Sequence, residues 1–408
     1  MRCNKSPENV VMLLRINNAT SMRPTTAIAT LILVTVLFVV SACNKHHDAP
    51  APILTTAPNN VYVLGSSGDT LAYWKNDSPV TLATTATAAS YLSGMALVNN
   101  SVYVTGGGDA NPTTLFGEVW TRIQNQSVQS SSLLDTAGNS SNVHTNGIFT
   151  SSTGDVYVAG TVWYNGQSNV PYTTPTANYP LSGYIATYWK NGKAVNLPSM
   201  GYLAGGTSTT SEHADYVSGI FVSGSDVYVA GGSNEYIADS ANTYQFARYW
   251  KNGVSVNLSG GLIDSSTGGT VTSRPNTTGI YVSGSDVYVS GTLSGSRALY
   301  WKNGAPIFLT GAGTLGAAAQ SILVAGSDVY AAGYVDSAGS SYAVIWKNGA
   351  STTLSANPST ANGIAVSGDS VYVAGSENVN GKSYATVWAN GQATHLGAGG
   401  AAWAIAVQ

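Results

Sequence analysis

The chain is poor in charge, nearly free of cysteine, and lacks any amphipathic helical pattern. Only 9% of its 408 residues are Asp, Glu, Lys or Arg, and the formal net charge is −3. No cluster of Lys and Arg stands outside the predicted turns, which argues against a nucleic-acid partner. The only cysteines are Cys3 and Cys43, too few for a disulfide framework. The fold must therefore be stabilised by packing and hydrogen bonds.

The short motifs of common enzymes are also missing. The sequence has no Gly-x-Ser-x-Gly elbow, no His-Glu-x-x-His motif, no Gly-x-x-x-x-Gly-Lys-Ser/Thr phosphate loop and no Asp-rich calcium loop. Its many Gly-x-Gly pairs fall between predicted strands, where they act as turns. We therefore predict no cofactor and no bound metal.

What the chain has instead is a sevenfold repeat. A strand reading Val-Tyr-Val, or a close variant, is followed by a Trp that in most copies opens Trp-Lys-Asn-Gly. The repeated residues are Tyr62, Tyr103, Tyr157, Tyr228, Tyr288, Tyr330 and Tyr372, and Trp74, Trp120, Trp189, Trp250, Trp301, Trp346 and Trp388. Units of roughly 40 residues or more, too small to bury an apolar face alone, predict a solenoid, an array or a propeller.

Each unit resolves into four short strands, here called A to D. In the fourth repeat they cover residues 219–223, 227–230, 246–250 and 254–258, with Asn252-Gly253 between C and D. Asn-Gly between apolar runs predicts a type I′ hairpin turn, because both central residues need positive φ. The first two repeats carry Asn76-Asp77 and Gln124-Asn125 at this place.

The two ends of the repeat region complement each other. Residues 402–408 match the A-strand pattern of residues 362–367, whereas the first repeat has strands B to D and only a poor strand A. A ring in which the C-terminal strand completes the first blade leaves no open edge. We therefore predict an all-β fold, a seven-bladed β-propeller of four-stranded antiparallel blades.

At this point the chain resembles the seven-bladed β-propellers, with an architecture similar to the kelch and WD-repeat groups. It has neither the Gly-Gly-plus-Tyr pattern of kelch repeats nor a recurring Trp-Asp dipeptide. The resemblance covers about residues 58–408 and implies architecture, not activity.

The N-terminal region predicts export and a lipid anchor. Residues 27–40 are apolar apart from two Thr and end in Val40-Ser41-Ala42-Cys43, which resembles the bacterial lipobox. By that resemblance, Cys43 carries the lipid after cleavage, and the outer membrane is favoured, because Asn44 stands where an Asp would be the usual signal for retention in the inner membrane. We expect a lipoprotein signal peptide (1–42), a flexible tether (43–57) and the propeller (58–408). An ordinary secretory signal is the alternative.

The two faces of the predicted ring differ. Lysines at the C–D turns and aspartates at the A–B turns emerge on one face, where we expect weak, solvated ion pairs. These residues are Lys190, Lys251, Lys302 and Lys347, and Asp155, Asp226, Asp286 and Asp328. The opposite side, here called the variable face, carries the B–C and D–A loops, whose lengths differ greatly between repeats. Variable loops on a rigid scaffold are usual carriers of binding.

The B–C loop of the third repeat is the first candidate site. It combines Trp163, Tyr164, Tyr172 and Tyr179 with Asn165, Gln167, Asn169 and Asn178, and it has no charged residue. Flat rings beside amides suit neutral sugars, whose C–H faces stack while their hydroxyls form hydrogen bonds. A loop packed on its own aromatics is the alternative.

The mouth of the central channel is the second candidate. At one level we expect Ser93, Asn146, Ser218, Thr278, Gln320, Asn362 and Trp403, and one step further out Tyr91, His144, Tyr216 and Asn276. The D–A loop before the fourth blade adds Glu212, His213 and Asp215. Such a mouth can hold a ligand, and His with acids can serve as general acid or base.

Three functions remain open from the sequence. The favoured one is a binding or interaction module for a glycan or a protein, acting as a monomer. The second is a glycan-degrading lyase or hydrolase using His144, His213, Tyr216 and an acid from Glu212 or Asp215. The third is a structural envelope protein without a small ligand.

The lipid anchor gives the first testable prediction. Cys43→Ala should release the chain from the membrane fraction, because lipid chains supply the membrane affinity that a polar domain lacks. Metabolic labelling with a fatty-acid analogue checks this, and a wild-type protein that takes up no label would rule the anchor out.

Overall fold

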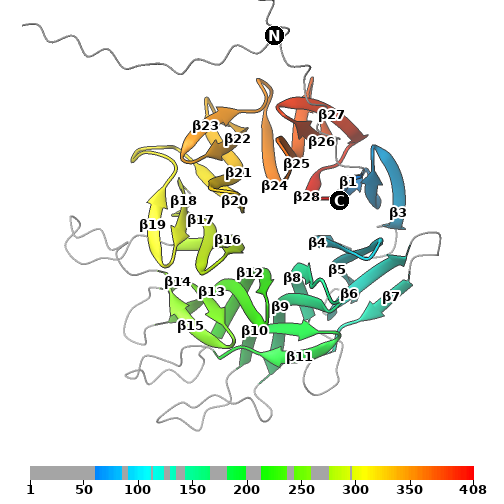
Figure 1. The fold of residues 1–408 in the computed structure, drawn as a ribbon, viewed down its shortest axis with the longest axis vertical. Helices are drawn as coiled ribbons and strands as arrows, with labels where there is room; N and C mark the ends of the chain where they lie inside the picture. The colour runs from blue at the N-terminus through cyan, green and yellow to red at the C-terminus, as the bar shows by residue number, and fades with distance from the viewer. Residues whose placement is uncertain are drawn as a thin grey trace, which may run out of the picture. The chain divides into compact units, whose positions relative to one another are not determined.

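The computed structural model describes residues 60–84, 91–111, 114–123, 129–134, 143–165, 182–198, 213–236, 243–258, 275–294 and 296–408. They form seven four-stranded antiparallel blades arranged in a ring, with the A strands innermost (Figure 1). Within these ranges there is no helix, and hence none long and apolar enough to span a membrane. The predicted seven-bladed propeller is confirmed.

The blades are numbered 1 to 7 in chain order, and the four strands of each blade occupy equivalent positions around the ring. The A strands are β28 (Ala402–Val407), β4 (Tyr91–Val98), β8 (Val143–Thr150), β12 (His213–Ser223), β16 (Pro275–Ser283), β20 (Ala317–Ala325) and β24 (Ser359–Ser367). The B strands are β1 (Val61–Ser67), β5 (Ser101–Asn111), β9 (Val156–Asn165), β13 (Asp226–Tyr236), β17 (Asp286–Leu293), β21 (Asp328–Ser337) and β25 (Ser370–Val379). The C strands are β2 (Thr70–Lys75), β6 (Thr114–Ile123), β10 (Ser182–Lys190), β14 (Thr243–Lys251), β18 (Arg297–Lys302), β22 (Ser340–Lys347) and β26 (Lys382–Ala389). The D strands are β3 (Ser78–Thr84), β7 (Gln129–Ser132), β11 (Lys193–Asn196), β15 (Val254–Asn257), β19 (Ala305–Phe308), β23 (Ala350–Thr353) and β27 (Gln392–Ala398).

The C-terminal strand closes the ring as the sequence predicts. β28 pairs antiparallel with β1, from Val61 opposite Val407 to Gly65 opposite Ala402. The backbones of Asn60 and Gln408 exchange two further hydrogen bonds of 3.2 and 3.0 Å. Blade 1 is therefore built from both ends of the propeller, and its B strand has no free edge.

The predicted C–D turns also form. In blade 3, Asn191 and Gly192 have φ values of 49° and 81°, and in blade 1, Asn76 and Asp77 reach 47° and 65°. Both pairs thus have the two positive φ values of a type I′ turn, so Asn-Asp replaces Asn-Gly without changing the hairpin. The turn Gln124-Asn125 lies outside the described residues.

The repeated tryptophans join neighbouring blades. Trp74, Trp189, Trp250, Trp301, Trp346 and Trp388 are all less than 2% exposed or at that limit. Trp250 packs with Ala186 and Leu197 of the preceding blade, and Trp301 packs likewise with Ala247 and Leu258. The indole N–H of Trp250 also donates to the Pro198 carbonyl at 2.8 Å. Each blade therefore completes its core on the next.

The face opposite the variable loops carries the ion pairs that the sequence predicts. In blades 3 to 6 the Lys ammonium lies 2.8 to 3.0 Å from the Asp carboxylate. In blade 4, Lys251 also lies over the Tyr228 ring, and the Asn252 amide donates to Asp226 at 2.7 Å. The lysine and the amide lower the pKa of the Asp226 carboxyl. These exposed pairs tie the A–B turn to the C–D turn.

Closure gives the second prediction. Deleting residues 403–408 should expose the β1 edge and remove Trp403 from the blade 1 and 2 core, causing aggregation or a large drop in melting temperature. A matched deletion of residues 44–51, in the segment predicted to be a tether, should change the melt little. Equal melting temperatures for the two truncations would contradict closure as the source of stability.

Candidate functional site

The residues predicted to lie at the channel mouth occupy a recurring β-bulge. In blades 2 to 7 the register between strands A and B shifts by one residue just before the middle of strand A. In blade 1 the partner of strand B jumps from Ala404 to Ala402. The unmatched residues are Ser93, Asn146, Ser218, Thr278, Gln320, Asn362 and Trp403. An extra residue in one strand re-aims its side chain, here at the centre of the ring.

A glycine on strand B makes the bulge possible. In blade 5, a Cβ on Gly291 would lie 2.2 Å from the Asn276 carbonyl oxygen and 2.7 Å from the Trp301 ring. Gly231 stands in the same position in blade 4, where a Cβ would lie 2.1 Å from the Tyr216 carbonyl oxygen. The bulge and the buried tryptophan thus meet at a position that only glycine can fill.

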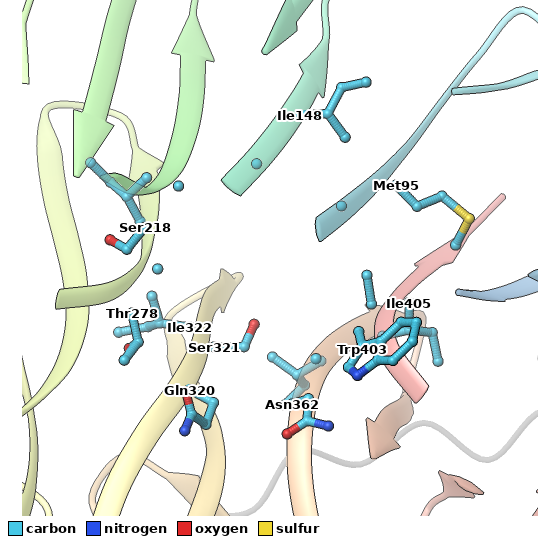
Figure 2. Close-up of a pocket in the computed structure, with 18 of the residues that line it drawn as sticks. Met95, Ile148, Ser218, Thr278, Gln320, Ser321, Ile322, Asn362, Trp403 and Ile405 are labelled. Atoms are coloured by element: carbon cyan, nitrogen blue, oxygen red, sulfur yellow. The ribbon is translucent and has the colours of Figure 1, made fainter. Parts of the chain in front are cut away.

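The bulge residues of blades 1 and 4 to 7 line an open cavity of about 210 Å³ in the channel (Figure 2). Ser218, Thr278, Gln320, Asn362 and Trp403 contribute the side chains at this level. An apolar ring lies two residues further along each strand A and consists of Met95, Ile148, Ile220, Ile280, Ile322, Ile364 and Ile405. None of the lining residues is charged.

Some bulge hydroxyls are used to join blades. Ser93 and Thr145 hydroxyls lie 3.0 Å apart across blades 2 and 3, and Ser218 and Thr277 hydroxyls lie 2.8 Å apart across blades 4 and 5. Thr278 donates to a backbone carbonyl of blade 6. These side chains stabilise the inner ring.

Tyr91 and Tyr216, one step further out than the bulge residues, also form hydrogen bonds between neighbouring blades. The Tyr91 hydroxyl accepts a hydrogen bond from the Thr145 backbone N–H at 3.0 Å, and Tyr216 accepts one from the Thr277 N–H at 3.4 Å. The phenol of Tyr216 is thereby committed to the junction of blades 4 and 5. Asn276 lies at the equivalent position of blade 5, and its buried side-chain oxygen has no hydrogen-bond partner among the described residues.

Four rings form a continuous aromatic row on the variable face. The His144 ring lies 6.0 Å from Tyr91 and 5.6 Å from Tyr184, and Tyr184 meets Trp163 edge-on at 4.9 Å between centroids. All four side chains are partly exposed. The row therefore connects the channel mouth to the end of the third blade's strand B.

The sequence did not single out Tyr184. It lies directly opposite Trp163 in the β9–β10 ladder. Cross-strand pairing could have identified Tyr184. The pairing of Lys190 with Tyr157 beside the Asn191-Gly192 turn fixes the register of β9 and β10, and that register places Tyr184 opposite Trp163. Tyr164 lies in β9 by its backbone, whereas Tyr172 and Tyr179 lie outside the described residues.

Asp215 has a structural partner. Its carboxylate is 4% exposed and accepts a hydrogen bond from the Ala186 backbone N–H at 3.2 Å. β11 is too short to cover the upper half of β10, so the start of β12 pairs with β10 in parallel, with Gly183 opposite His213. Asp215 satisfies the next N–H along that edge. Glu212 lies outside the described residues.

A further polar cluster lies on blade 7, where the sequence pointed to nothing. The Glu377 carboxylate bonds the His395 ring at 2.7 Å and accepts hydrogen bonds from Ser355 and Asn357. Burial raises the pKa of Glu377, but the three hydrogen bonds outweigh it and lower the pKa overall. His395 in turn stacks on Tyr384 at 4.6 Å. The cluster ties the D–A connection to strands B and D.

Within the described ranges, no group of three or more His, Cys, Asp or Glu side chains is placed to hold a metal ion. Asn146 and Trp403, the remaining candidates, are exposed and partly exposed respectively. The mouth is thus a neutral, hydroxyl- and amide-bearing surface next to an aromatic row.

The role of Asp215 gives the third prediction. Asp215→Ala should leave the Ala186 N–H without this acceptor in a buried position, which costs about 1–3 kcal/mol of unfolding free energy. Chemical denaturation measures the loss. Asp336→Ala, which removes a partly exposed aspartate on strand B of blade 6 that accepts a hydrogen bond from Ser341, is the comparison. A fully stable Asp215→Ala protein with altered ligand binding would contradict the structural role.

No protein family model and no curated protein sequence matches the chain. Solved structures that are similar to it include Trypanosoma rangeli sialidase, with 10% identity and a TM-score of 0.41 over 79% of this chain and 58% of that one. The acylaminoacyl peptidase of Pyrococcus horikoshii has 11% identity and a TM-score of 0.40. The match covers 76% of this chain and 52% of the peptidase. The β-propeller domain of the Trilobed protease from Pyrococcus furiosus has 11% identity and a TM-score of 0.34. The match covers 75% of this chain and 97% of that domain. The chain thus spans little more than half of the first two enzymes, and likenesses of this size carry no information on activity.

Proposed function

We propose that the chain is a lipid-anchored propeller of the bacterial cell envelope that binds a neutral glycan on its variable face. The observation that carries this proposal is the aromatic row of Tyr91, His144, Tyr184 and Trp163, which starts beside an uncharged channel mouth. The anchor and the envelope location rest on the lipobox at residues 40–43.

The row lies where a large ligand can reach it. Tyr91 and His144 lie near the starts of the A strands β4 and β8, and Tyr184 lies near the start of the C strand β10. Trp163 lies near the end of the B strand β9. In a propeller all of these ends emerge on the same side, so the four partly exposed rings share one surface. The ion pairs of blades 3 to 6 lie on the other side.

The chemistry of this surface suits sugars better than charged partners. Aromatic rings combine a large apolar surface with restricted conformational freedom, which makes them effective binding anchors. The Trp163 and Tyr184 rings meet edge to face, so this contact covers neither face of the ring that presents its edge. Neutral hydroxyls and amides at the mouth can then bond to sugar hydroxyls without burying an unpaired charge.

The catalytic alternative is weakened by the contacts of its candidate residues. Asp215 and Tyr216 accept hydrogen bonds from backbone N–H groups that hold blades 3, 4 and 5 together. A group that is committed to a structural hydrogen bond is poorly placed to exchange protons with a substrate. His144 remains next to the rings, where an imidazole can form hydrogen bonds as well as stack.

Binding by the aromatic row gives the fourth prediction. Trp163→Ala and Tyr184→Ala should each weaken glycan binding by about 1–3 kcal/mol, the scale for truncated aromatic anchors. The measurement is a glycan-array screen of the full-length protein in detergent, followed by calorimetry on the best ligand. Lys302→Ala, on the opposite face, is the control and should bind as the wild type does.

Other results would select the other functions. Turnover of a polysaccharide that His144→Ala abolishes, with ligand affinity nearly intact, would make the protein an enzyme. A lower melting temperature for Trp163→Ala with unchanged affinity would mean that the row packs on itself, and this surface would be abandoned. Binding to a purified envelope protein and to no glycan would replace the glycan by a protein partner.

A further inference from the structure

We propose that the channel cavity is a separate subsite for a single neutral sugar residue, held by Trp403 and by the side-chain amides of Gln320 and Asn362. This inference rests on the proposed function, because it assigns the terminal residue of a glycan on the same face to a place inside the ring.

The cavity is asymmetric around the channel. Blades 6, 7 and 1 follow one another around the ring and contribute the long bulge side chains Gln320, Asn362 and Trp403. Blades 4 and 5 contribute only Ser218 and Thr278 at this level. Figure 2 shows Gln320, Asn362 and Trp403 following one another around the opening, with Thr278 next to Gln320 and Ser218 beyond it. The cavity is therefore lined by amide and indole side chains along one arc and by short hydroxyl side chains along the next.

The two sets also differ in their hydrogen bonds. The Ser218 and Thr278 hydroxyls are engaged across blade junctions. The Gln320 side chain, by contrast, forms no hydrogen bond with any residue in the described ranges. The Asn362 amide nitrogen donates to the Ala402 carbonyl at 2.8 Å, which fixes the side chain and leaves its oxygen as an acceptor. The amides of Gln320 and Asn362 therefore offer a ligand both donors and acceptors.

Trp403 supplies an apolar surface beside these amides. Its ring packs against the buried cluster of blades 1 and 2, which includes Leu92 and Met95, and it remains partly exposed. A ring held from behind and open to the channel is a stacking surface that loses little conformational entropy on binding. Two residues further along the A strands, Ile322, Ile364 and other members of the apolar ring line the same cavity.

The size and the neutrality of the cavity restrict the ligand class. A volume of about 210 Å³ is smaller than the roughly 300–1,000 Å³ of pockets for drug-sized ligands, so the cavity suits one sugar ring, and the rest of a longer glycan would lie outside it. No charged side chain lines the wall, so an acidic or amino sugar would bury an unpaired charge. A neutral sugar has an apolar C–H face for Trp403 and hydroxyl edges for the two amides.

The test uses the full-length protein in detergent with glucose, galactose, mannose and N-acetylglucosamine, each alone. Glucuronate and glucosamine are the charged counterparts. Calorimetry measures affinity, and tryptophan fluorescence reports the site, because the described scaffold tryptophans are buried whereas Trp403 and Trp163 are partly exposed. We expect at least one neutral sugar to bind, the charged counterparts to bind at least tenfold more weakly, and the emission change to persist in Trp163→Phe and vanish in Trp403→Phe.

Variants separate the two side-chain contributions. Gln320→Ala should weaken binding about threefold to tenfold, the range for one neutral hydrogen bond. Gln392→Ala is the matched control, since it makes the same change on the exposed edge of β27. Trp403→Ala should weaken binding at least tenfold, and if this variant does not fold, Gln320→Ala and Trp403→Phe decide the question.

Two results would overturn the subsite. The first is a neutral sugar that binds with unchanged affinity to folded Gln320→Ala and Trp403→Phe proteins. If Trp163→Ala still weakens glycan binding in that preparation, the proposed function stands and only the subsite is wrong. The second is that none of the four neutral sugars binds; glycans bound on the array would then still support the function.

Discussion

The packing of one tryptophan per blade against the preceding blade is the contact on which the rest of the ring depends. Burying an aromatic side chain of this size removes about 150–250 Å² from water, worth roughly 4–6 kcal/mol before entropy is counted. At several junctions the partners are an alanine on strand C and a leucine just after strand D, as in Trp346 with Ala298 and Leu309. Trp189 packs instead with Val119 and Leu133 of the preceding blade. A blade without its neighbour would expose both halves of the contact, so the ring gains stability only when closed.

The same packing explains why the channel carries individual side chains. The tryptophan and the bulged strand A approach the same strand B glycine, so that position is fixed. The bulge residue on strand A varies from Ser218 to Gln320 to Trp403. Some of these side chains form hydrogen bonds to the next blade, as Ser218 does. Five of the seven bulge positions line one cavity.

Much of this architecture follows from local sequence. Asn-Gly turns, alternating apolar strands and the unmatched C-terminal strand sufficed to predict the blades, the closure and the ion pairs, because each depends on neighbours in a hairpin or on a repeat that is copied. The bulge was not predicted, although its extra residue shifts the alternation of strand A by one. Contacts between blades were missed because their partners are far apart in the sequence. The partner of Asp215 lies 29 residues away, and Glu377 is held by Asn357 of a D–A connection and by His395 of β27.

Cross-strand pairs show how such positions compensate one another. In blade 4 the large Tyr216 lies opposite Gly232, and in blade 6 the order is reversed, with Ala318 opposite Tyr334. In blade 7 the pair is Thr360 and Ser376, whose hydroxyls lie 2.9 Å apart. In blades 4 and 6 a large residue on one strand faces a small residue on the other, so either strand can fill the space while the chemistry of the pair changes. A comparison of single positions among repeats therefore overstates their variability, because the pair is the unit of packing.

The hydrogen bonds of the bulge residues affect stability as well as binding. In blades 2, 4 and 5 the bulge hydroxyl forms a hydrogen bond to a neighbouring blade. In blade 6 the Gln320 side chain forms no such bond, and in blade 1 the bulge residue is the indole of Trp403. Between these two blades, Asn362 of blade 7 donates to the Ala402 carbonyl of β28, the strand that closes the ring by pairing with β1. A ligand bridging Gln320 and Trp403 would add a second link to β28, from blade 6. Since a ligand that binds only the folded state stabilises it in proportion to ln(1 + [L]/Kd), occupancy of the cavity and closure of the ring would support each other.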